Sequence, residues 1–280
     1  MKTAILIPAR YASTRYPGKP LVALRGAGGV SKTLIERSWE AAMAVSDVAA
    51  GDASVFVATD DDRIAEASRS FGAEVVMTSE SCRNGTERCR DALSRLPFAP
   101  DLVVNLQGDA PLTPPWFVEA LIDAMRDDDQ DGPAGAYQAA TPVLRCDGAT
   151  HAKFIEDRRA GRVGGTTAVF GAGGRALYFS KEVIPFTGES FASQFAAESE
   201  TPVFHHVGLY AYRPAALEAY AAWEPGPLET LEGLEQLRFL ENGAAVRCVE
   251  VEARGRVFWE LNNPVDVERI EAALSEMGQA

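Results

Sequence analysis

The chain opens with a short apolar run, residues 4–7, that is followed at once by a polar and basic segment. Consecutive apolar residues without polar alternation are typical of a strand that is buried on both faces, as in a parallel sheet. Pro8 and the Pro17–Gly18 pair interrupt regular structure around the basic segment. Since parallel sheets are covered by helices on both faces, this opening predicts an α/β protein.

Three cationic side chains lie in the segment that follows the first predicted strand: Arg10, Arg15 and Lys19. No acidic residue occurs anywhere in residues 1–25. Open α/β sheets bind ligands at the carboxyl ends of their strands. Arginine offers a planar fork of donors and lysine a point charge, and both suit phosphate groups. The loop is therefore predicted to bind a polyphosphate, with an ordinary basic surface loop as the alternative.

The rest of the chain is acidic, with 27 Lys and Arg against 40 Asp and Glu, a net charge of −13 and a pI of about 4.8. This balance argues against a nucleic-acid or anionic-membrane partner, because both carry negative charge. The cationic loop is a local exception, which favours a small anionic ligand. Abundant carboxylates also suit a protein that binds Mg²⁺.

Strands and helices alternate along the first part of the chain, which predicts right-handed crossovers in a mainly parallel sheet flanked by helices. Without a linker-like segment, we expect one domain over residues 1–280 with an inserted lobe over roughly 147–213. The expected strands are 55–58, 74–78, 101–109, 139–144, 204–213 and 245–251, with a hairpin of 166–170 and 176–180. The expected helices are 33–45, 64–71, 86–96, 115–125, 214–223, 228–240 and one from an Asn263 cap to about 277.

Three later features add detail to this outline. His206, Tyr210 and Tyr212 have the same parity in the predicted strand 204–213, so they are expected on one face. Residues 187–202 lack periodicity and form a candidate lid. Residues 228–240 carry a leucine stripe at helical spacing, which predicts a helix with one buried face.

The strand expected over residues 101–109 ends in Gly108 and Asp109. A carboxylate at the end of a central strand, close to a phosphate loop, is well placed to bind Mg²⁺. Asp109 could instead cap the helix that starts near Pro115.

Asn84 and Gly85 form a turn signal before a helix expected to start at Thr86, where backbone and ligand can approach closely. An ordinary turn and cap is the alternative there.

Residues 26–33 resemble a phosphate-binding P-loop in composition but not in spacing. Such a loop needs a glycine directly before its lysine, and Ser31 stands at that position before Lys32. A flexible loop leading into a helix fits better, although a P-loop phosphotransferase that uses Lys32 remains an alternative.

Four cysteines are dispersed, without a C-x-x-C pair, which favours free thiols in a reducing compartment over a zinc site. The N-terminus does not resemble a signal peptide, and no apolar run approaches the ~18 residues that a membrane span needs. We therefore expect a cytoplasmic protein without membrane insertion.

Several motifs together resemble those of the 3-deoxy-manno-octulosonate (Kdo) cytidylyltransferase family, in the order in which that family has them. The resemblance implies a Rossmann-like nucleotide-diphospho-sugar transferase fold with a lobe for dimerisation and sugar binding. It also implies a homodimer that uses Mg²⁺ to transfer CMP from CTP to Kdo, giving CMP-Kdo and pyrophosphate for lipopolysaccharide biosynthesis. The motifs are residues 7–21, 57–60, 84–88, 105–109, 176–180 with 184–185, 206–213 and 234–238.

The same resemblance implies roles for individual residues. Arg10, Arg15 and Lys19 would bind the triphosphate, with Arg15, Lys19 and Asp109 as the catalytic set. The cytidine would be bound by Ala9, Asn84, Gly85 and Thr86, and the metal by Asp109 and Asn262. The sugar acid would be bound by Gln107, His206, Tyr212, Glu235 and Gln236.

Three positions depart from the family pattern. Asn262 stands where the family has a metal-binding Asp, so Mg²⁺ binding is expected to be weaker. Ala110 replaces a Glu, and Thr167 occupies the position of a Lys near the sugar site. These changes leave open another ulosonic acid, such as an amino-substituted Kdo or a sialic-acid-like sugar. A CTP-binding regulator without catalytic activity is a further alternative.

Overall fold

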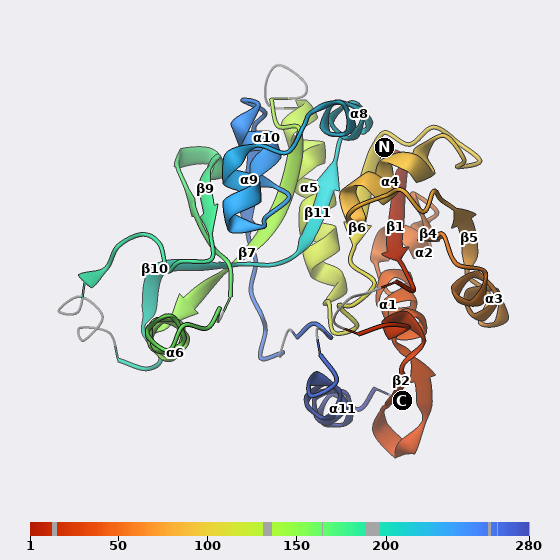
Figure 1. Cartoon of the computed structure of the whole chain (residues 1–280), viewed down its shortest axis with the longest axis horizontal. Coiled ribbons are helices and arrows are strands. Elements are labelled where there is room, and N and C mark those ends of the chain that lie inside the picture. The colour runs from red at the N-terminus through yellow and green to blue at the C-terminus, as the bar shows by residue number, and fades with distance from the viewer. Residues whose placement is uncertain are drawn as a thin grey trace. The chain divides into compact units, whose positions relative to one another are not determined.

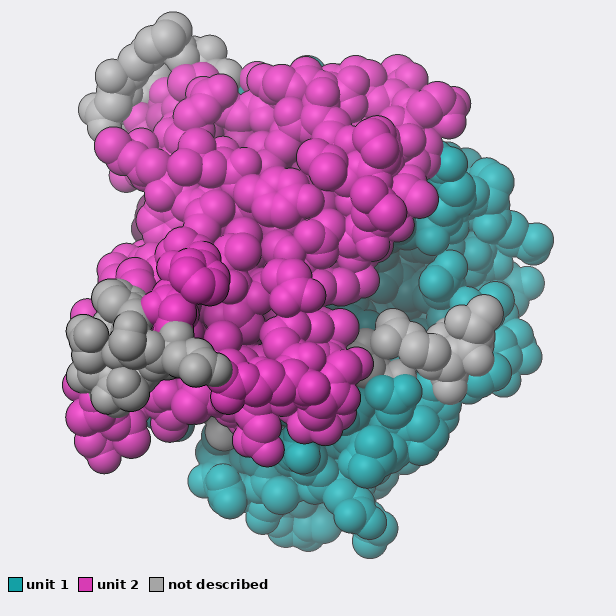
Figure 2. All heavy atoms as spheres, turned by 60° about the vertical axis from the view of Figure 1, so that its left-hand side comes forward, with its two compact units in different colours: residues 1–122, 211–218, 253–280 teal, residues 123–210, 219–252 magenta. Residues whose placement is uncertain are grey.

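The computed structural model describes residues 1–12, 16–130, 136–163, 165–188, 196–256, 259–261 and 263–279. The chain forms two compact units, which are coloured separately in Figure 2. Unit 1 comprises residues 1–122, 211–218 and 253–280, and unit 2 comprises residues 123–210 and 219–252. The lobe expected over 147–213 has other bounds than unit 2, whose strands include residues on both sides of that range.

The sheet of unit 1 is built on four parallel strands, and β1 lies between β4 and β6 (Figure 1). Ile5 of β1 is paired with Val55 of β4 and with Val104 of β6. Residues 4–7 are fully buried, as the unbroken apolar run predicted. The strands are β1 (Thr3–Ala9), β4 (Ala53–Thr59), β5 (Glu74–Met77) and β6 (Leu102–Leu106), and β11 (Leu209–Tyr212) follows β6 in the order.

Helices connect these strands, and side chains cap three of them, those that begin at Leu34, Asp62 and Gly85. The Thr33 hydroxyl accepts from the Glu36 backbone amide. The helix expected to start at Thr86 is capped instead by Asn84, which accepts from the Glu87 amide at 2.8 Å. The remaining elements of unit 1 include η1 (Lys19–Leu21), β2 (Ala23–Arg25), η2 (Ala27–Gly29), β3 (Ser31–Thr33), α1 (Leu34–Met43), α2 (Ser46–Ala50), α3 (Asp62–Ser70) and α4 (Gly85–Leu93).

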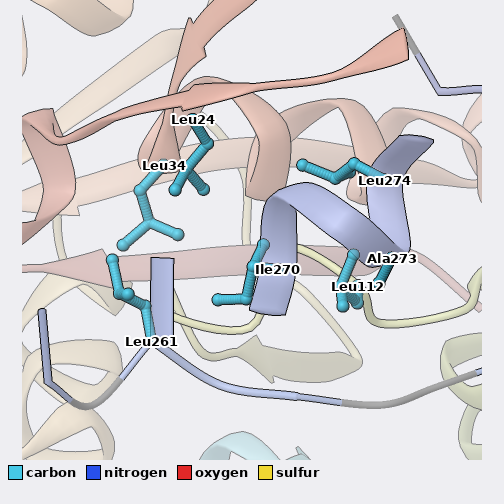
Figure 3. Packing of buried hydrophobic residues seen from close by; sticks show 7 residues of the cluster. All are labelled: Leu24, Leu34, Leu112, Leu261, Ile270, Ala273 and Leu274. Carbon is cyan, nitrogen blue, oxygen red and sulfur yellow. The ribbon is translucent and has the colours of Figure 1, made fainter. Parts of the chain in front are cut away.

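The C-terminal helix α11 (Asp266–Glu276) packs into the core of unit 1. Figure 3 shows Ile270 and Leu274 of this helix with Leu24 and Leu34 from the N-terminal region. Asn263 is not the N-cap that the sequence predicted, because the helix begins three residues later. The Asp266 carboxylate instead accepts from the Asn263 amide at 2.7 Å. The buried cluster is Leu24, Leu34, Leu112, Leu261, Ile270, Ala273 and Leu274.

Unit 2 has a sheet in the order β7-β10-β8-β9, with β12 parallel to β7. The predicted hairpin of β8 and β9 is confirmed. Two helices, α5 and α8, contribute residues to both units. The elements are β7 (Ala139–Asp147), α6 (Gly148–Arg159), β8 (Thr167–Phe170), η3 (Ala172–Gly174), β9 (Ala176–Ser180), β10 (Glu200–His206), α9 (Pro227–Glu232), α10 (Leu237–Glu241) and β12 (Val246–Glu250), with α5 (Pro115–Gln130) and α8 (Pro214–Ala222) shared.

Two predictions for the second half of the chain are wrong. The single helix over 228–240 is divided into α9 and α10 by Gly233, whose φ of 60° is left-handed. As a result Leu231, expected in the buried stripe, is 82% exposed. The strand expected over 204–213 is likewise divided into β10 and β11 at Val207 and Gly208.

Of the 16 residues of the candidate lid, 187–202, the seven at 189–195 lie outside the described residues, and 200–202 belong to β10. Among the helices that the structure describes, none combines the length and apolar character needed to cross a bilayer.

Candidate functional site

The strand order of unit 1 reverses between β1 and β6. From β1 the chain adds β4 and β5 on one side, and then returns to place β6 on the other side. Open α/β sheets bind ligands outside the carboxyl ends of their strands at such a reversal. Since β1 leads into the cationic loop and β6 leads into Gly108 and Asp109, the fold brings these two segments to one place.

Lys19 and Asp109 form an ion pair at this place, with 2.6 Å between Nζ and Oδ2. Both side chains are partly buried, with exposed fractions of 15% and 26%. The pair joins residues 90 positions apart in the sequence. A predicted phosphate-binding lysine therefore contacts the predicted metal-binding carboxylate directly, and both remain accessible to a ligand.

The backbone fixes the distance between the two segments. A Cβ atom at Gly108 would lie 2.7 Å from the carbonyl oxygen of Pro8, closer than real Cβ contacts allow. Gly108 in turn accepts a hydrogen bond from the Ser38 hydroxyl at its carbonyl oxygen. The Leu261 amide donates to the Asp109 carbonyl at 2.8 Å, so a third segment meets the same corner.

The predicted nucleotide-binding turn lies beside the end of β6. Arg10 donates to the carbonyl oxygen of Arg83 at 3.4 Å, which connects the cationic loop with this turn. A Cβ atom at Gly85 would lie 3.2 Å from both terminal amide atoms of Gln107. Gln107, expected near the sugar, therefore lies against the turn expected to bind cytidine. Ala9 is buried at the end of β1.

Tyr212 and Thr86 are joined by a buried hydrogen bond of 2.9 Å between their hydroxyl groups. Both residues belong to unit 1. Tyr212 was expected to bind the sugar acid together with His206, which belongs to unit 2. The structure thus groups Tyr212 with the nucleotide-binding turn.

Asn105 is a buried polar residue of β6 that the sequence-based predictions did not include. It is fully buried, and neither atom of its amide group has a hydrogen-bond partner among the described residues. A Cβ atom at Gly85 would lie 3.3 Å from its nitrogen. An asparagine inside the apolar stretch 102–106 is the sequence signal that points to it.

Gln236 lies at the start of α10 in unit 2, with Glu235 beside it. The Tyr210 hydroxyl donates to Oε1 of Gln236 at 3.1 Å. Nε2 of Gln236 is buried and has no partner among the described residues. Tyr210 was expected only to share a face with His206 and Tyr212, and its contact with Gln236 depends on the corner between α9 and α10. No sequence pattern signals that corner.

His206 lies next to Tyr210, with 5.6 Å between the ring centres, and 2.9 Å from the Thr141 hydroxyl. That hydroxyl has one proton and lies 2.8 Å from the Leu209 carbonyl oxygen, which can only accept. The hydroxyl therefore accepts from Nε2 of His206, and Nδ1 is the unprotonated nitrogen. Burial, with a smaller contribution from His205, lowers the pKa of His206 to about 3. His206 is thus a neutral hydrogen-bonding group rather than an acid or a base at neutral pH.

Two positions that depart from the family pattern are buried. Thr167 donates to the Glu182 carbonyl at 2.6 Å and accepts from the Ile184 amide at 3.1 Å. Its side chain is therefore committed to holding the segment after β9. Ala110 is 2% exposed, and its carbonyl accepts from the Thr113 hydroxyl.

Arg15 and Asn262 lie outside the described residues, so their expected roles stay predictions. Within the described part of the chain, no group of three or more His, Cys, Asp or Glu side chains is arranged to hold a metal. Mg²⁺ in phosphate-transfer sites needs only one or two carboxylates, because substrate phosphates and water complete the coordination. Asp109, partly exposed at a strand end, fits such a site.

The P-loop alternative does not agree with the structure around Lys32. The segment forms an antiparallel hairpin of β2 and β3 instead of a loop between a buried strand and a helix. The Lys32 ammonium pairs with Glu40 at 2.7 Å. Lys32 therefore has a carboxylate partner away from the Lys19–Asp109 pair.

Comparison with known proteins identifies the family. The family model described as cytidylyltransferase matches residues 4–251. A 3-deoxy-manno-octulosonate cytidylyltransferase of Maricaulis maris is 43% identical over 279 residues, covering 100% of this chain and 99% of the relative. The chain belongs to the cytidylyltransferase family. The predicted family and the α/β fold class are therefore confirmed.

Two further relatives of this cytidylyltransferase bear on its substrate. A solved structure of a CMP:2-keto-3-deoxy-manno-octonic acid synthetase complexed with CTP has a TM-score of 0.80 and 32% identity, with 99% of this chain and 100% of the other covered. An 8-amino-3,8-dideoxy-manno-octulosonate cytidylyltransferase of Shewanella frigidimarina is 37% identical, with 98% of this chain and 99% of the relative covered.

Proposed function

We propose that this cytidylyltransferase transfers CMP from CTP to 3-deoxy-D-manno-octulosonate, releasing pyrophosphate. The observation that carries the proposal is the Lys19–Asp109 pair of 2.6 Å at the reversal point of the sheet. Nucleotidyl transfer needs cations for the triphosphate and a carboxylate for a divalent metal at the same place. A relative that is 43% identical over its full length and named for this reaction supports the choice of sugar acid.

The reaction requires no covalent intermediate on the protein. The anomeric hydroxyl oxygen of the sugar acid forms a bond to the α-phosphorus of CTP, and the bond from that phosphorus to the bridging oxygen of pyrophosphate breaks. The hydroxyl proton is released to water, and the negative charge accumulates on the leaving pyrophosphate. Arg10, Arg15 and Lys19 would stabilise that charge, and such contacts act mainly by positioning and electrostatics.

Asp109, with Asn262 as a second oxygen ligand, would hold Mg²⁺. The ion, when bound, neutralises phosphate charge and lowers the pKa of a coordinated hydroxyl. Since Lys19 and Asp109 pair with each other in this structure, Lys19 is already positioned next to the place where the phosphates of a metal-bound nucleotide would lie. Asn262 contributes no charge, so we expect the site to need more Mg²⁺ than one with two carboxylates.

The sugar acid would meet the polar side chains of unit 2. Nε2 of Gln236 is a buried donor, and the carboxylate and hydroxyl groups of an ulosonic acid are acceptors. His206 is neutral, so it would contribute a hydrogen bond rather than charge. Glu235 adds a carboxylate that can accept from sugar hydroxyls.

The cellular setting follows from the same proposal. We expect a homodimer in the cytoplasm that supplies CMP-Kdo for lipopolysaccharide biosynthesis. The four cysteines are all free and buried, which fits a reducing compartment. Light scattering of the purified protein tests the dimer.

One assay tests the reaction. The protein is mixed with CTP, Mg²⁺ and Kdo, and the release of pyrophosphate is measured together with the CMP-linked sugar. Parallel reactions with an amino-substituted Kdo and a sialic acid test the alternative that the substrate is another ulosonic acid. Reactions with UTP and ATP test the specificity for CTP. Binding of CTP without pyrophosphate from any sugar acid would contradict the proposal and favour a regulator.

A further inference from the structure

Tyr11 closes the base of the cationic loop. Its carbonyl oxygen accepts from the Gly18 amide at 2.9 Å, which ties the two ends of the loop together. A Cβ atom at Gly18 would lie 3.1 Å from Cζ of the Tyr11 ring, so the ring lies directly on the Gly18 backbone. Gly18 also has a φ of 71°, which favours glycine. The cations Arg10 and Lys19 directly flank this closure.

Arg63 covers the other side of the Tyr11 ring. Its guanidinium carbon lies 3.3 Å from the ring centre, the geometry of a cation–π contact. The face of the ring that does not touch Gly18 is thereby occupied. Arg63 lies in the first turn of α3, outside every motif that signals the family.

Asp61 fixes the position of Arg63. One carboxylate oxygen accepts from Nε at 3.0 Å and the other from Nη2 at 2.6 Å, which is a bidentate pair. Asp61 also caps α3 by accepting from the Arg63 backbone amide. Hydrogen bonds from Arg63 lower the pKa of Asp61, so the carboxylate stays charged near neutral pH. Because the cap orients Asp61, the guanidinium is held over Tyr11 by the helix itself.

We propose that Arg63 is a positioning residue for the triphosphate-binding loop. The stack of Asp61, Arg63 and Tyr11, which we call the neck clamp, holds the two ends of the loop together before a nucleotide binds. The inference rests on the proposed function for the identity of the ligand. A loop whose two ends are already held together loses less conformational entropy on binding, so the neck clamp strengthens nucleotide binding without touching the nucleotide. Two of the three guanidinium nitrogens of Arg63 are engaged by Asp61, which separates this role from that of a phosphate ligand.

The decisive variant is Arg63→Met, which keeps an unbranched side chain but removes the planar cation. Arg69→Met is the matched control, because Arg69 is an exposed residue of the same helix and its loss changes the net charge equally. Calorimetric titration with CTP and Mg²⁺ is expected to show three- to tenfold weaker binding for Arg63→Met and less than a twofold change for Arg69→Met. KM for CTP should rise by the same factor, while kcat and KM for the sugar acid change less than twofold.

Tyr11 supplies a second test. Tyr11→Phe keeps the ring and should leave CTP affinity within twofold, whereas Tyr11→Leu should weaken binding as much as Arg63→Met does. The double variant that combines Tyr11→Leu with Arg63→Met should bind CTP no more weakly than either single variant, because both substitutions break the same stack. Additive losses would contradict the neck clamp.

Amide hydrogen exchange of the free protein makes the test independent of the ligand. Exchange of the Gly18 amide, which is bonded to Tyr11, should become faster in Arg63→Met and stay unchanged in Arg69→Met. If Arg63→Met leaves both exchange and CTP affinity unchanged, or if the two arginine variants lose affinity equally, the inference is wrong. If exchange is faster in Arg63→Met as expected but wild-type protein binds no CTP, the proposed function fails while the neck clamp stands.

Discussion

The two units present different kinds of polar group to a ligand. In unit 1 the described residues predicted to bind the triphosphate and the metal, Arg10, Lys19 and Asp109, are charged and at least partly exposed. In unit 2 His206 and Gln236 are buried, and the structure keeps His206 neutral. A triphosphate with a metal needs charge to compensate it, whereas a sugar is distinguished by the arrangement of its hydroxyl groups. The difference supports the proposal that unit 1 supplies electrostatic stabilisation and unit 2 supplies sugar recognition.

The largest effect is expected from Asp109→Ala, which removes the only charged group assigned to the metal. We expect kcat to fall about 30-fold to 1,000-fold, corresponding to about 2–4 kcal/mol of lost transition-state stabilisation. Steady-state pyrophosphate release measures this loss, and circular dichroism shows whether the protein remains folded. Asp52→Ala, an exposed aspartate of the same unit, is the control. A folded Asp109→Ala variant with a near-normal rate would contradict the electrostatic role of unit 1.

Acid should destabilise the fold through His206. Its pKa is about 3 in the folded protein against about 6.5 when unfolded, so the unfolded state binds more protons between these values. The contribution of His206 to the free energy of unfolding is therefore fully present above pH 6.5. It decreases as the pH falls, by about 2–3 kcal/mol at pH 4.5. Urea unfolding at pH 7 and pH 4.5 measures it.

The matched variant for that measurement is His206→Gln. It removes the titrating group, so the loss of stability between the two pH values should become smaller, although His205 still contributes because burial lowers its pKa to about 4. An unchanged pH dependence in His206→Gln would show that His206 does not stay neutral in the fold.

A smaller and more selective effect is expected from Gln236→Met, which keeps the length of the side chain but removes the buried donor. KM for the sugar acid should rise about tenfold, near 1.4 kcal/mol, because a hydrogen bond to a charged acceptor is lost. The affinity for CTP should stay within twofold. Calorimetry with CTP and kinetics with varied sugar acid separate the two. If Gln236→Met weakened the binding of CTP and of the sugar acid equally, the assignment of sugar recognition to unit 2 would be contradicted.

The smallest effect is expected from Lys32→Ala. Lys32 pairs with Glu40 on a partly exposed surface, and such pairs contribute about 0–1 kcal/mol to stability. Turnover and CTP affinity should stay within twofold of wild type. Loss of activity, or ATP hydrolysis that disappears in this variant, would instead support the P-loop reading.

Much of unit 1 follows from local sequence patterns. The apolar runs of β1, β4 and β6 identify buried parallel strands, and their carboxyl ends predict where Lys19 and Asp109 meet. The capping contact between Thr33 and Glu36 is equally local, because it depends only on residues three apart. Three of the family motifs, residues 7–21, 57–60 and 105–109, lie at these strand ends, and the family that the motifs indicated is confirmed.

Unit 2 was less predictable because its features depend on tertiary contacts. The leucine spacing around Leu231 gives no sign that Gly233 ends a helix in a left-handed conformation, and the helical pattern therefore misplaces Leu231. Helix α6, which is not among the helices that the sequence predicted, has only three buried residues, so it lacks an apolar stripe. The contact between Tyr210 and Gln236 joins residues 26 positions apart and needs the corner between α9 and α10.

Gly108 limits how this protein can be altered. A side chain at position 108 would collide with the Pro8 carbonyl oxygen. It would therefore push apart the backbones of β1 and β6 at the ends that lead to Lys19 and Asp109. Substitutions at positions 19 and 109 change the length of the side chain but leave the position of the backbone unchanged. A mutational library should therefore tolerate no residue other than glycine at position 108, even though this residue carries no functional group. Grafting of the first loop from a relative should succeed only when the glycine accompanies it.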